Sequence, residues 1–266
     1  MTRLAFLDSV LREAAERLPP GGGGAVTKPG EPNQVVTEAD HEIEEFLTAR
    51  IRAAYPEHDI LGEETGFHGM NARATWVLDP IDGTSNYAAG SPLFGIMAGL
   101  LVDGVPVAGG VALPAFGEVY LAERGAGAFR NGQRLRPPTA SDLSASLIAY
   151  GIDGESELAR QDFEFAAELA TRCRGLRMGN SVFDLMQLAT GAYGASLNRT
   201  TRIWDSVAPH VILEEAGIPY TGFFGEPISY SPLDVAAKAN FTVCAAVPGL
   251  HPQIQRLLGG ASSQPA

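Results

Sequence analysis

The chain has 266 residues, enough for one large domain or two tightly joined halves with a substantial hydrophobic core. Acidic residues outnumber basic ones by 31 to 19, and the resulting net charge of −12 argues against a footprint on the nucleic-acid backbone. Two widely separated cysteines predict a reducing compartment and no disulfide framework. The N-terminus is charged too early for a signal peptide, and the most apolar stretch, 93–102, is far shorter than the roughly 20 residues of a membrane span. We therefore expect a cytoplasmic globular protein with neither a nucleic-acid nor a membrane partner.

The first sixty residues predict two helices and a short strand. Apolar residues at helical spacing indicate an amphipathic helix over 3–18 that ends at Pro19-Pro20, followed by a glycine-rich loop with room for a short hairpin. Thr37 and Asp40 have the spacing of a capping box, which predicts that a second helix starts there. After it, residues 59–62 read as a strand whose final glycine leaves space for a carboxylate.

The stretch 76–86 is the strongest candidate for a site. Residues 76–78 read as a short buried strand that runs into Asp79-Pro80-Ile81-Asp82, and residues 83–86 then turn the chain. Two carboxylates three residues apart can converge on one point when Pro80 stiffens the link between them. Carboxylate oxygens of this kind bind Mg²⁺, and backbone N–H groups in the following turn are suited to a phosphate. An ordinary Asp-Pro/Asp-Gly turn is the structural alternative.

The remainder of the chain mixes strands and helices, which predicts the α/β class. Apolar or β-branched runs at 93–101, 105–113 and 119–122 indicate an antiparallel meander, followed by a hairpin over 127–134. Pro137-Pro138 marks the joint between two halves. Beyond it the pattern predicts a strand over 146–150 and helices over 155–172, 181–190 and 204–216.

Three ordered motifs resemble one family. Residues 79–87 closely resemble the DPIDGT(T/S)N(F/Y) motif of the inositol monophosphatase family, whose members are Mg²⁺-dependent and usually lithium-sensitive phosphomonoesterases. Residues 62–65 resemble its GEE(S/T) element, and residues 204–217 resemble WDxAAxxxxxxEAGG. With 36–40 the likeness spans about residues 4 to 258. It implies a layered α-β-α-β-α sandwich of the inositol monophosphatase/fructose-1,6-bisphosphatase type, one domain over 1–266 with halves of about 1–140 and 141–260.

The resemblance also implies a set of metal ligands. Glu63, Asp79 and the Ile81 carbonyl would bind one Mg²⁺, and Asp79, Asp82 and Asp205 a second, within a site of two or three ions. The implied reaction is phosphate monoester hydrolysis by water without a phosphoenzyme. Read without the family, Asp205 is an ordinary acid at a helix start.

Water and phosphate positions follow from the same resemblance. Glu63 and Thr84 would position the attacking water, with Asp40 holding Thr84 by a hydrogen bond, and the Gly83 and Thr84 N–H groups would bind phosphate oxygens. Lys28, in the loop before the second helix, either assists phosphate or the metal ions, or is a solvated lysine.

Substrate contacts are implied less sharply. Besides Asp82 and Asp205, the expected substrate contacts are Gly179, Asn180, Ser181 and Asn198. The alternative for residues 179–181 is an ordinary helix cap. Many inositol-cleaving members have Glu where this chain has Asn198, and Pro209 replaces an alanine of the downstream motif. These departures lie on the substrate side, so the reaction is better supported than inositol as its substrate.

The sequence therefore predicts a Mg²⁺-dependent, inositol-1-monophosphatase-like hydrolase of a small phosphorylated metabolite. Alternatives with the same chemistry are histidinol phosphate, a sugar bisphosphate and adenosine 3′,5′-bisphosphate. A nucleotide pocket needs basic side chains, for which Arg199 and Arg202 are the nearby candidates. A regulatory or binding protein that retains the fold is a further alternative, and the family implies a homodimer.

Overall fold

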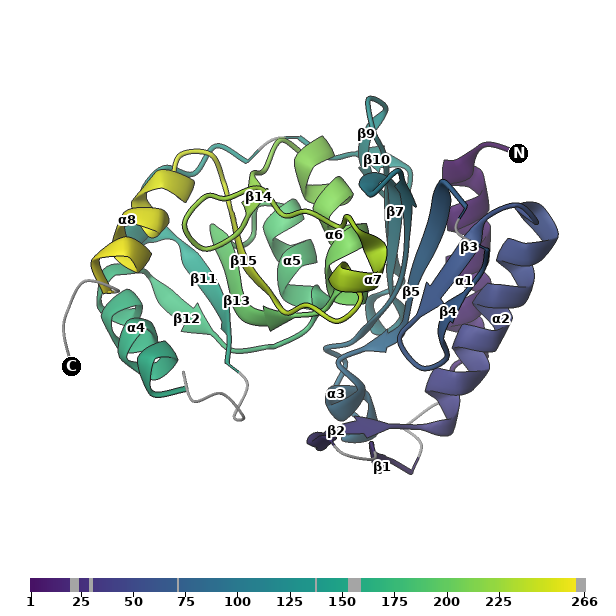
Figure 1. The fold of residues 1–266 in the computed structure, drawn as a ribbon. Coiled ribbons are helices and arrows are strands. Elements are labelled where there is room, and N and C mark those ends of the chain that lie inside the picture. The colour runs from purple at the N-terminus through teal and green to yellow at the C-terminus, as the bar shows by residue number, and fades with distance from the viewer. Residues whose placement is uncertain (20–23, 29–30, 71, 137, 153–158, 262–266) are drawn as a thin grey trace.

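The computed structural model describes the chain apart from residues 20–23, 29–30, 71, 137, 153–158 and 262–266, and for 31–34 and 260–261 it describes the backbone alone. Five layers succeed one another in the order helix, sheet, helix, sheet, helix (Figure 1). The predicted layered α-β-α-β-α sandwich is confirmed.

An eight-stranded sheet organises the first half. The predicted meander is present, and every neighbouring pair of strands is antiparallel except Asp59–Gly62 (β3) with Ala74–Asp82 (β5). β5 runs from Ala74 to Asp82, so the predicted strand 76–78 is the middle of a nine-residue strand. In sheet order the strands are β10 (Gln133–Arg134), β9 (Gly127–Arg130), β8 (Glu118–Glu123), β7 (Val105–Leu113), β6 (Gly95–Val102), β5, β3 (Asp59–Gly62) and β4 (Gly66–His68).

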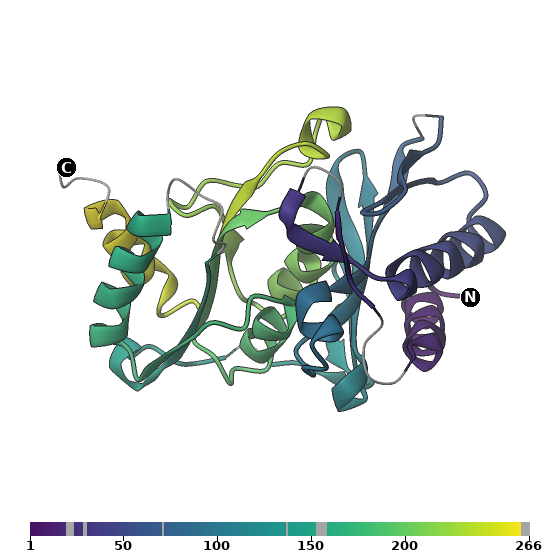
Figure 2. The same cartoon turned by 90° about the horizontal axis from the view of Figure 1, so that it is seen from below.

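Two helices cover the outer face of this sheet. α1 (Arg3–Arg17) and α2 (Glu38–Ala54) bury their apolar stripes against it, which confirms the helical spacing read from the sequence. The hairpin of β1 (Val26–Lys28) and β2 (Glu31–Val36) lies at one end of the sheet beside α3 (Thr84–Ala88) (Figures 1 and 2).

The other face packs on α5 (Val182–Ala189) and α6 (Ile203–Glu215), which separate the large sheet from a five-stranded one. In the smaller sheet the order is β12 (Gly175–Arg177), β11 (Leu147–Gly151), β13 (Ala195–Thr201), β15 (Phe241–Ala246) and β14 (Tyr220–Thr221). α4 (Ala159–Arg172) and α8 (His251–Ala261) form the outermost layer, and α7 (Leu233–Ala236) and two 3₁₀ turns, Pro114–Phe116 and Leu143–Ala145, complete the elements. The first four residues of the predicted helix 155–172 lie outside the described residues.

None of the helices within the described part of the chain is long and apolar enough to cross a membrane.

Candidate active site

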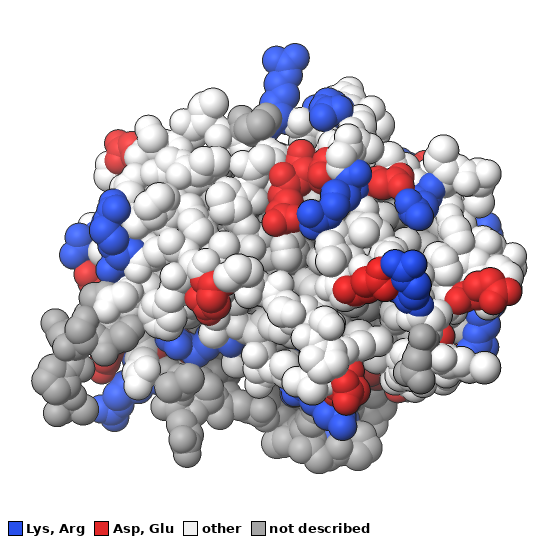
Figure 3. Space-filling view, turned by 45° about the horizontal axis from the view of Figure 1, so that its top comes forward, with Lys and Arg blue, Asp and Glu red and all other residues white. Residues whose placement is uncertain are grey.

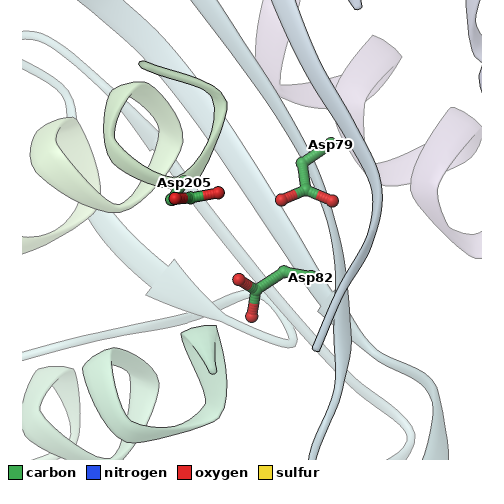
Figure 4. Close-up of side chains that lie close together, drawn as sticks. All are labelled: Asp79, Asp82 and Asp205. Atoms are coloured by element: carbon green, nitrogen blue, oxygen red, sulfur yellow. The ribbon is translucent and has the colours of Figure 1, made fainter. Parts of the chain in front are cut away.

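Three aspartates converge where the two halves meet. Asp79 and Asp82 come from the end of β5, and Asp205 comes from the first turn of α6 (Figure 4). One carboxylate oxygen of each lies within 4.8 Å of the others. The pairing of β5 with β6 is interrupted between Asp79 and Asp82, so the chain leaves the regular ladder where the two carboxylates turn inward. The sequence-based expectation that these two side chains converge agrees with this geometry.

Their charges lie out of water and close together. Asp79 is 1% exposed, and its Oδ1 has no hydrogen-bond partner among the described residues. Burial, followed by the negative charges of Glu63, Asp82 and Asp205, holds the pKa of Asp79 well above its usual range. Burial likewise raises the pKa of Asp82 to about 7, although the Val182 N–H group donates to its carboxylate and opposes the shift. An oxygen-only donor set, partly exposed at Asp82 and Asp205 and with an unpartnered oxygen on the buried Asp79, fits a hard divalent cation such as Mg²⁺.

α6 is seated on the large sheet by two glycines that face each other across β6 and β7. Gly99 pairs with Gly109 across the two strands, and because neither has a side chain, the α6 backbone packs directly against both. A Cβ on Gly99 would lie 2.9 Å from the Ala208 nitrogen, and one on Gly109 would lie 2.7 Å from the Ala208 oxygen. Because a side chain at either position would push the helix outward, the close approach fixes how near Asp205 comes to β5.

Asp205 combines the two roles that the sequence left open. Its Oδ2 accepts a hydrogen bond from the Arg202 N–H group at 2.6 Å, as in a capping box, while its carboxylate belongs to the acidic cluster. The cap holds the carboxylate at the helix start, so the structural role also serves the site.

Glu63 follows β3 and is paired with a lysine. Lys28 Nζ lies 2.7 Å from Glu63 Oε1 and 2.6 Å from Glu64 Oε1, so Lys28 is not a solvated loop residue. Although burial opposes it, the two carboxylates raise the pKa of Lys28. Burial raises the pKa of Glu63 to about 7, with Lys28 opposing the shift and Asp205 adding to it.

A buried glutamate that the sequence reading missed holds the turn after β3. Glu44 is fully buried, and its carboxylate accepts from the Glu64 N–H group at 2.9 Å and the Thr65 N–H group at 2.8 Å. A Cβ on Gly62 would lie 2.3 Å from Glu44 Oε1, so the space predicted beside this glycine is filled by Glu44. The available signal was its spacing: Glu44 stands one turn after Asp40 on the same face of α2.

The hydrogen bond expected between Asp40 and Thr84 is present. Asp40 Oδ1 accepts from Thr84 Oγ1 at 3.3 Å, and its other oxygen accepts from the Thr37 N–H and hydroxyl groups at 2.7 and 2.6 Å. Thr84 Oγ1 also lies 2.9 Å from the Ile81 carbonyl. Asp40 is therefore both the acidic member of the predicted capping box, whose N-cap is Thr37, and a partner of Thr84.

Gly83 brings the two halves into contact at the start of α3. It has a positive φ of 83°, and a Cβ there would lie 3.0 Å from the Leu93 oxygen and 3.1 Å from Ser181 Cβ. First-turn N–H groups of a helix have no acceptor within it, so this turn is suited to an anion.

The second half adds a pocket beside the cluster. Its lining includes Asn180, Ser181 and Asn198, all predicted contacts, and the empty space, counted with its open mouth, is about 470 Å³. Gly179 does not line this pocket. A Cβ there would lie 2.7 Å from the Asp184 carboxylate, which accepts from the Gly179 and Asn180 N–H groups. The complete lining is Asp82, Gly151, Asn180, Ser181, Val182, Asp184, Leu185, Ser196, Leu197, Asn198, Thr201, Asp205 and Val243.

Asn198 is tied to its own surroundings. Its Oδ1 accepts from the Thr200 N–H group at 2.9 Å, and its Nδ2 lies 3.3 Å from Asn180 Oδ1. Asn180 itself has a left-handed backbone with φ of 52°, which an asparagine tolerates better than most residues. The two amides together form the polar wall of the pocket.

Arg199 and Arg202, the basic candidates named from the sequence, point elsewhere. Arg199 lies outside the pocket lining and pairs with Asp162 at 2.6 Å, as expected from alternation along β13, while Arg202 Nη1 donates to the Lys238 carbonyl at 3.3 Å. The structure therefore gives no support to a nucleotide pocket built on these side chains.

The fold and the sequence are similar to those of known phosphatases. The fold superposes on an IMPase from Thermotoga maritima with a TM-score of 0.87 and 25% identity, covering 98% of each chain. Inositol-1-monophosphatase ImpA from Mycolicibacterium smegmatis is 36% identical over 239 residues, 88% of this chain and 83% of the relative. A fructose-1,6-bisphosphatase/inositol-1-monophosphatase from Aquifex aeolicus is 32% identical over 209 residues, 77% of this chain and 78% of the relative. These proteins are phosphatases.

The model of the inositol monophosphatase family matches residues 9–258, and the chain belongs to that family. Other relatives carry different names. A histidinol-phosphatase from Chlorobaculum parvum is 34% identical over 68% of this chain and 70% of its own, and Nus factor SuhB from Salmonella typhimurium is 33% identical over 73% of each.

Proposed function

We propose that the protein is a Mg²⁺-dependent phosphomonoester hydrolase that uses water directly, without a phosphoenzyme. The observation that carries this proposal is the convergence of Asp79, Asp82 and Asp205, with a buried Asp79 oxygen that lacks a partner among the described residues. Together with Glu63 and the Ile81 carbonyl, these groups would hold two or three ions. Bound Mg²⁺ supplies Lewis-acid stabilisation of phosphoryl and leaving-group oxygens.

The chain's own groups would orient the reactants. The single Thr84 hydroxyl proton has two acceptors within reach, the Ile81 carbonyl and Asp40. With the proton donated to either of them, the Thr84 oxygen is left to accept a hydrogen bond from the attacking water. Glu63 would accept the second hydrogen bond of that water. The Gly83 and Thr84 N–H groups would donate to phosphate oxygens, where negative charge shifts in the transition state.

The substrate would be a small phosphorylated metabolite whose alcohol occupies the pocket. Asp82, Asp205, Asn180, Ser181 and Asn198 line this pocket and would contact the substrate. Inositol 1-phosphate is the first candidate, and histidinol phosphate, sugar bisphosphates and adenosine 3′,5′-bisphosphate are the rivals with the same chemistry. Phosphate release from each compound, with and without Mg²⁺, tests the proposal. Failure of Mg²⁺ to support release from any of them contradicts it.

Lithium sensitivity, a homodimeric state and a cytoplasmic location belong to the same proposal, on the strength of the family resemblance. We expect millimolar lithium to inhibit uncompetitively, because the full ligand set of the second ion is present. Steady-state rates in lithium against matched sodium measure this, and identical rates at high concentrations of either salt would argue that the second ion is held differently. Light scattering reports the oligomeric state.

Relatives named Nus factor SuhB favour a second candidate, a regulatory partner that keeps the fold. On the face drawn in Figure 3, basic and acidic side chains are interspersed and the basic ones form no continuous patch, which does not suit direct nucleic-acid binding. If the regulatory role were the sole one, purified protein would show no Mg²⁺-dependent phosphatase activity.

A further inference from the structure

The pocket beside the aspartates has no positively charged side chain in its wall. None of its lining residues is Lys or Arg. The positions outside the described residues contain no Lys or Arg, so none of them could add a basic side chain to this wall. The wall consists of amides, hydroxyls, apolar groups and carboxylates.

Arg199, which follows the lining residue Asn198 in sequence, is paired outside the pocket. Arg199 Nε donates to Asp162 Oδ1 at 2.6 Å, and its guanidinium carbon lies 5.0 Å from the centre of the Phe223 ring. Asp162 is only 2% exposed and also accepts from the Tyr150 hydroxyl at 2.7 Å. Turning Arg199 into the pocket would leave the buried Asp162 charge without its cation, which is strongly unfavourable.

The ionisable residues of the wall are all acidic. Asp82 and Asp205 would be neutralised by the metal ions of the proposed function, but Asp184 lies outside that cluster and stays in the wall. Its partners are backbone N–H groups of Gly179 and Asn180, which carry no net charge. Asp184 therefore brings no positive charge into the wall.

We infer that this pocket selects monophosphate esters of uncharged or cationic alcohols and discriminates against substrates that carry a second phosphate. The inference rests on the proposed function, because it concerns the alcohol side of the same reaction. Proteins recognise a phosphate with the guanidinium of Arg or the ammonium of Lys, and here a second phosphate would meet Asp184 and two amides. Sugar bisphosphates and adenosine 3′,5′-bisphosphate are thus disfavoured, whereas neutral polyols and amino alcohols remain.

The test compares matched pairs: inositol 1-phosphate with inositol 1,4-bisphosphate, and fructose 1-phosphate with fructose 1,6-bisphosphate. Mg²⁺ is kept in excess over total phosphate so that chelation does not differ within a pair. For a compound that is not cleaved, its inhibition constant against a cleaved monophosphate replaces kcat/KM. We expect each bisphosphate to be at least about tenfold poorer than its monophosphate, because like charges are brought together in the site. Equal or better use of the bisphosphates overturns the inference.

Two variants sharpen the result. Asn198→Arg puts a guanidinium into the pocket wall and should raise the bisphosphate-to-monophosphate ratio, whereas Arg199→Gln should leave that ratio unchanged. A selective loss of bisphosphate use in Arg199→Gln would mean that this arginine reaches the pocket, which also overturns the inference. Should Asn198→Arg not fold, the wild-type ratios decide. If no monophosphate is cleaved with Mg²⁺, the proposed function falls with the inference. If monophosphates and bisphosphates are cleaved alike, only the inference falls.

Discussion

The two halves of the site are built in different ways. The first half supplies buried acids on strand ends, and further buried acids support them: Asp40 binds Thr84, and Glu44 holds the turn after Glu63. The second half supplies one carboxylate to the cluster, Asp205, which depends on how α6 packs against the large sheet. Its remaining contribution is a pocket wall of amides, hydroxyls, apolar groups and the Asp184 carboxylate.

This contrast separates the chemistry from the choice of substrate. Metal ligands need a fixed number of oxygens at fixed positions, so the residues that surround them are constrained from several directions. A pocket wall has only to complement an alcohol, which different side chains can do. Of the two departures from the family motif, Asn198 lies in the pocket wall, which agrees with this division, whereas Pro209 lies within α6 and outside the pocket lining.

The largest expected effect comes from the first half. Asp82→Asn removes a negative ligand, so turnover should fall roughly 10³-fold or more. Because the pKa of Asp82 is already raised by burial, the metal-free variant should melt no lower than the wild type, while the Mg²⁺-induced rise in Tm should shrink. Phosphate release and thermal melting measure the two effects. Asp234→Asn, the same change at an exposed position in α7, is the control. Near wild-type turnover at saturating Mg²⁺ would contradict the ligand assignment.

The seating of α6 tests the second half's contribution to the metal site. Gly109→Ala should push α6 away from the sheet and raise the Mg²⁺ concentration for half-maximal activity about tenfold, equivalent to about 1.4 kcal/mol. It should also reduce the rise in Tm that Mg²⁺ produces without substrate.

Gly110→Ala is the matched control for this change. It lies on the same strand but faces α1, where its Cβ would lie 2.5 Å from Leu11 Cδ1. Both variants should lose about 1–3 kcal/mol of stability by overpacking, and only Gly109→Ala should weaken Mg²⁺ binding. If Gly109→Ala and Gly110→Ala need the same Mg²⁺ concentration for half-maximal activity, the close packing of α6 on Gly109 does not position Asp205. If Asp205→Asn also leaves Mg²⁺ binding unchanged, the ligand assignment itself is wrong.

Local patterns predicted much of this arrangement, and long-range contacts account for what was missed. The convergence of Asp79 and Asp82, the capping box of Thr37 and Asp40 and the helical stripe of α1 each depend on residues a few positions apart. Glu44, in contrast, reads as one of several glutamates on a charged helix, and only the approach of residues 64–65 from another strand gives it partners. The ion pairs of Lys28 likewise join residues 35 and 36 positions apart. The strands β13 and β15 and the helix α8 were not predicted, although residues 241–247 form an apolar or β-branched run longer than the one that predicted a strand at 119–122.

A pH experiment measures the repulsion within the acidic cluster. Glu63, Asp79 and Asp82 have pKa values raised above those of the unfolded chain. Between about pH 4 and 7 the folded state therefore holds more protons than the unfolded chain does. Stability contributed by these groups is therefore lost as the pH rises through this window. Metal-free protein should show a Tm that falls by several degrees across it, and saturating Mg²⁺ should remove most of the fall at the upper end. A Tm of the metal-free protein that increases from pH 5 to 7 would contradict this account.

The smallest expected effect concerns Asn198 in the second half. A glutamate there offers two acceptor oxygens to the hydroxyls of a polyol, whereas the asparagine oxygen already accepts from the Thr200 N–H group and its amide faces Asn180. An unsatisfied group in a hydroxyl-binding pocket costs about 1–3 kcal/mol, so Asn198→Glu should raise kcat/KM for inositol 1-phosphate relative to an aryl phosphate by roughly tenfold. The wild type should cleave inositol 1-phosphate without a clear preference over other small monophosphates. Asn198→Gln, which keeps an amide on the longer side chain, separates length from charge and should leave the ratio unchanged. A wild-type preference for inositol 1-phosphate of more than roughly a hundredfold that survives Asn198→Glu would show that this residue does not set specificity.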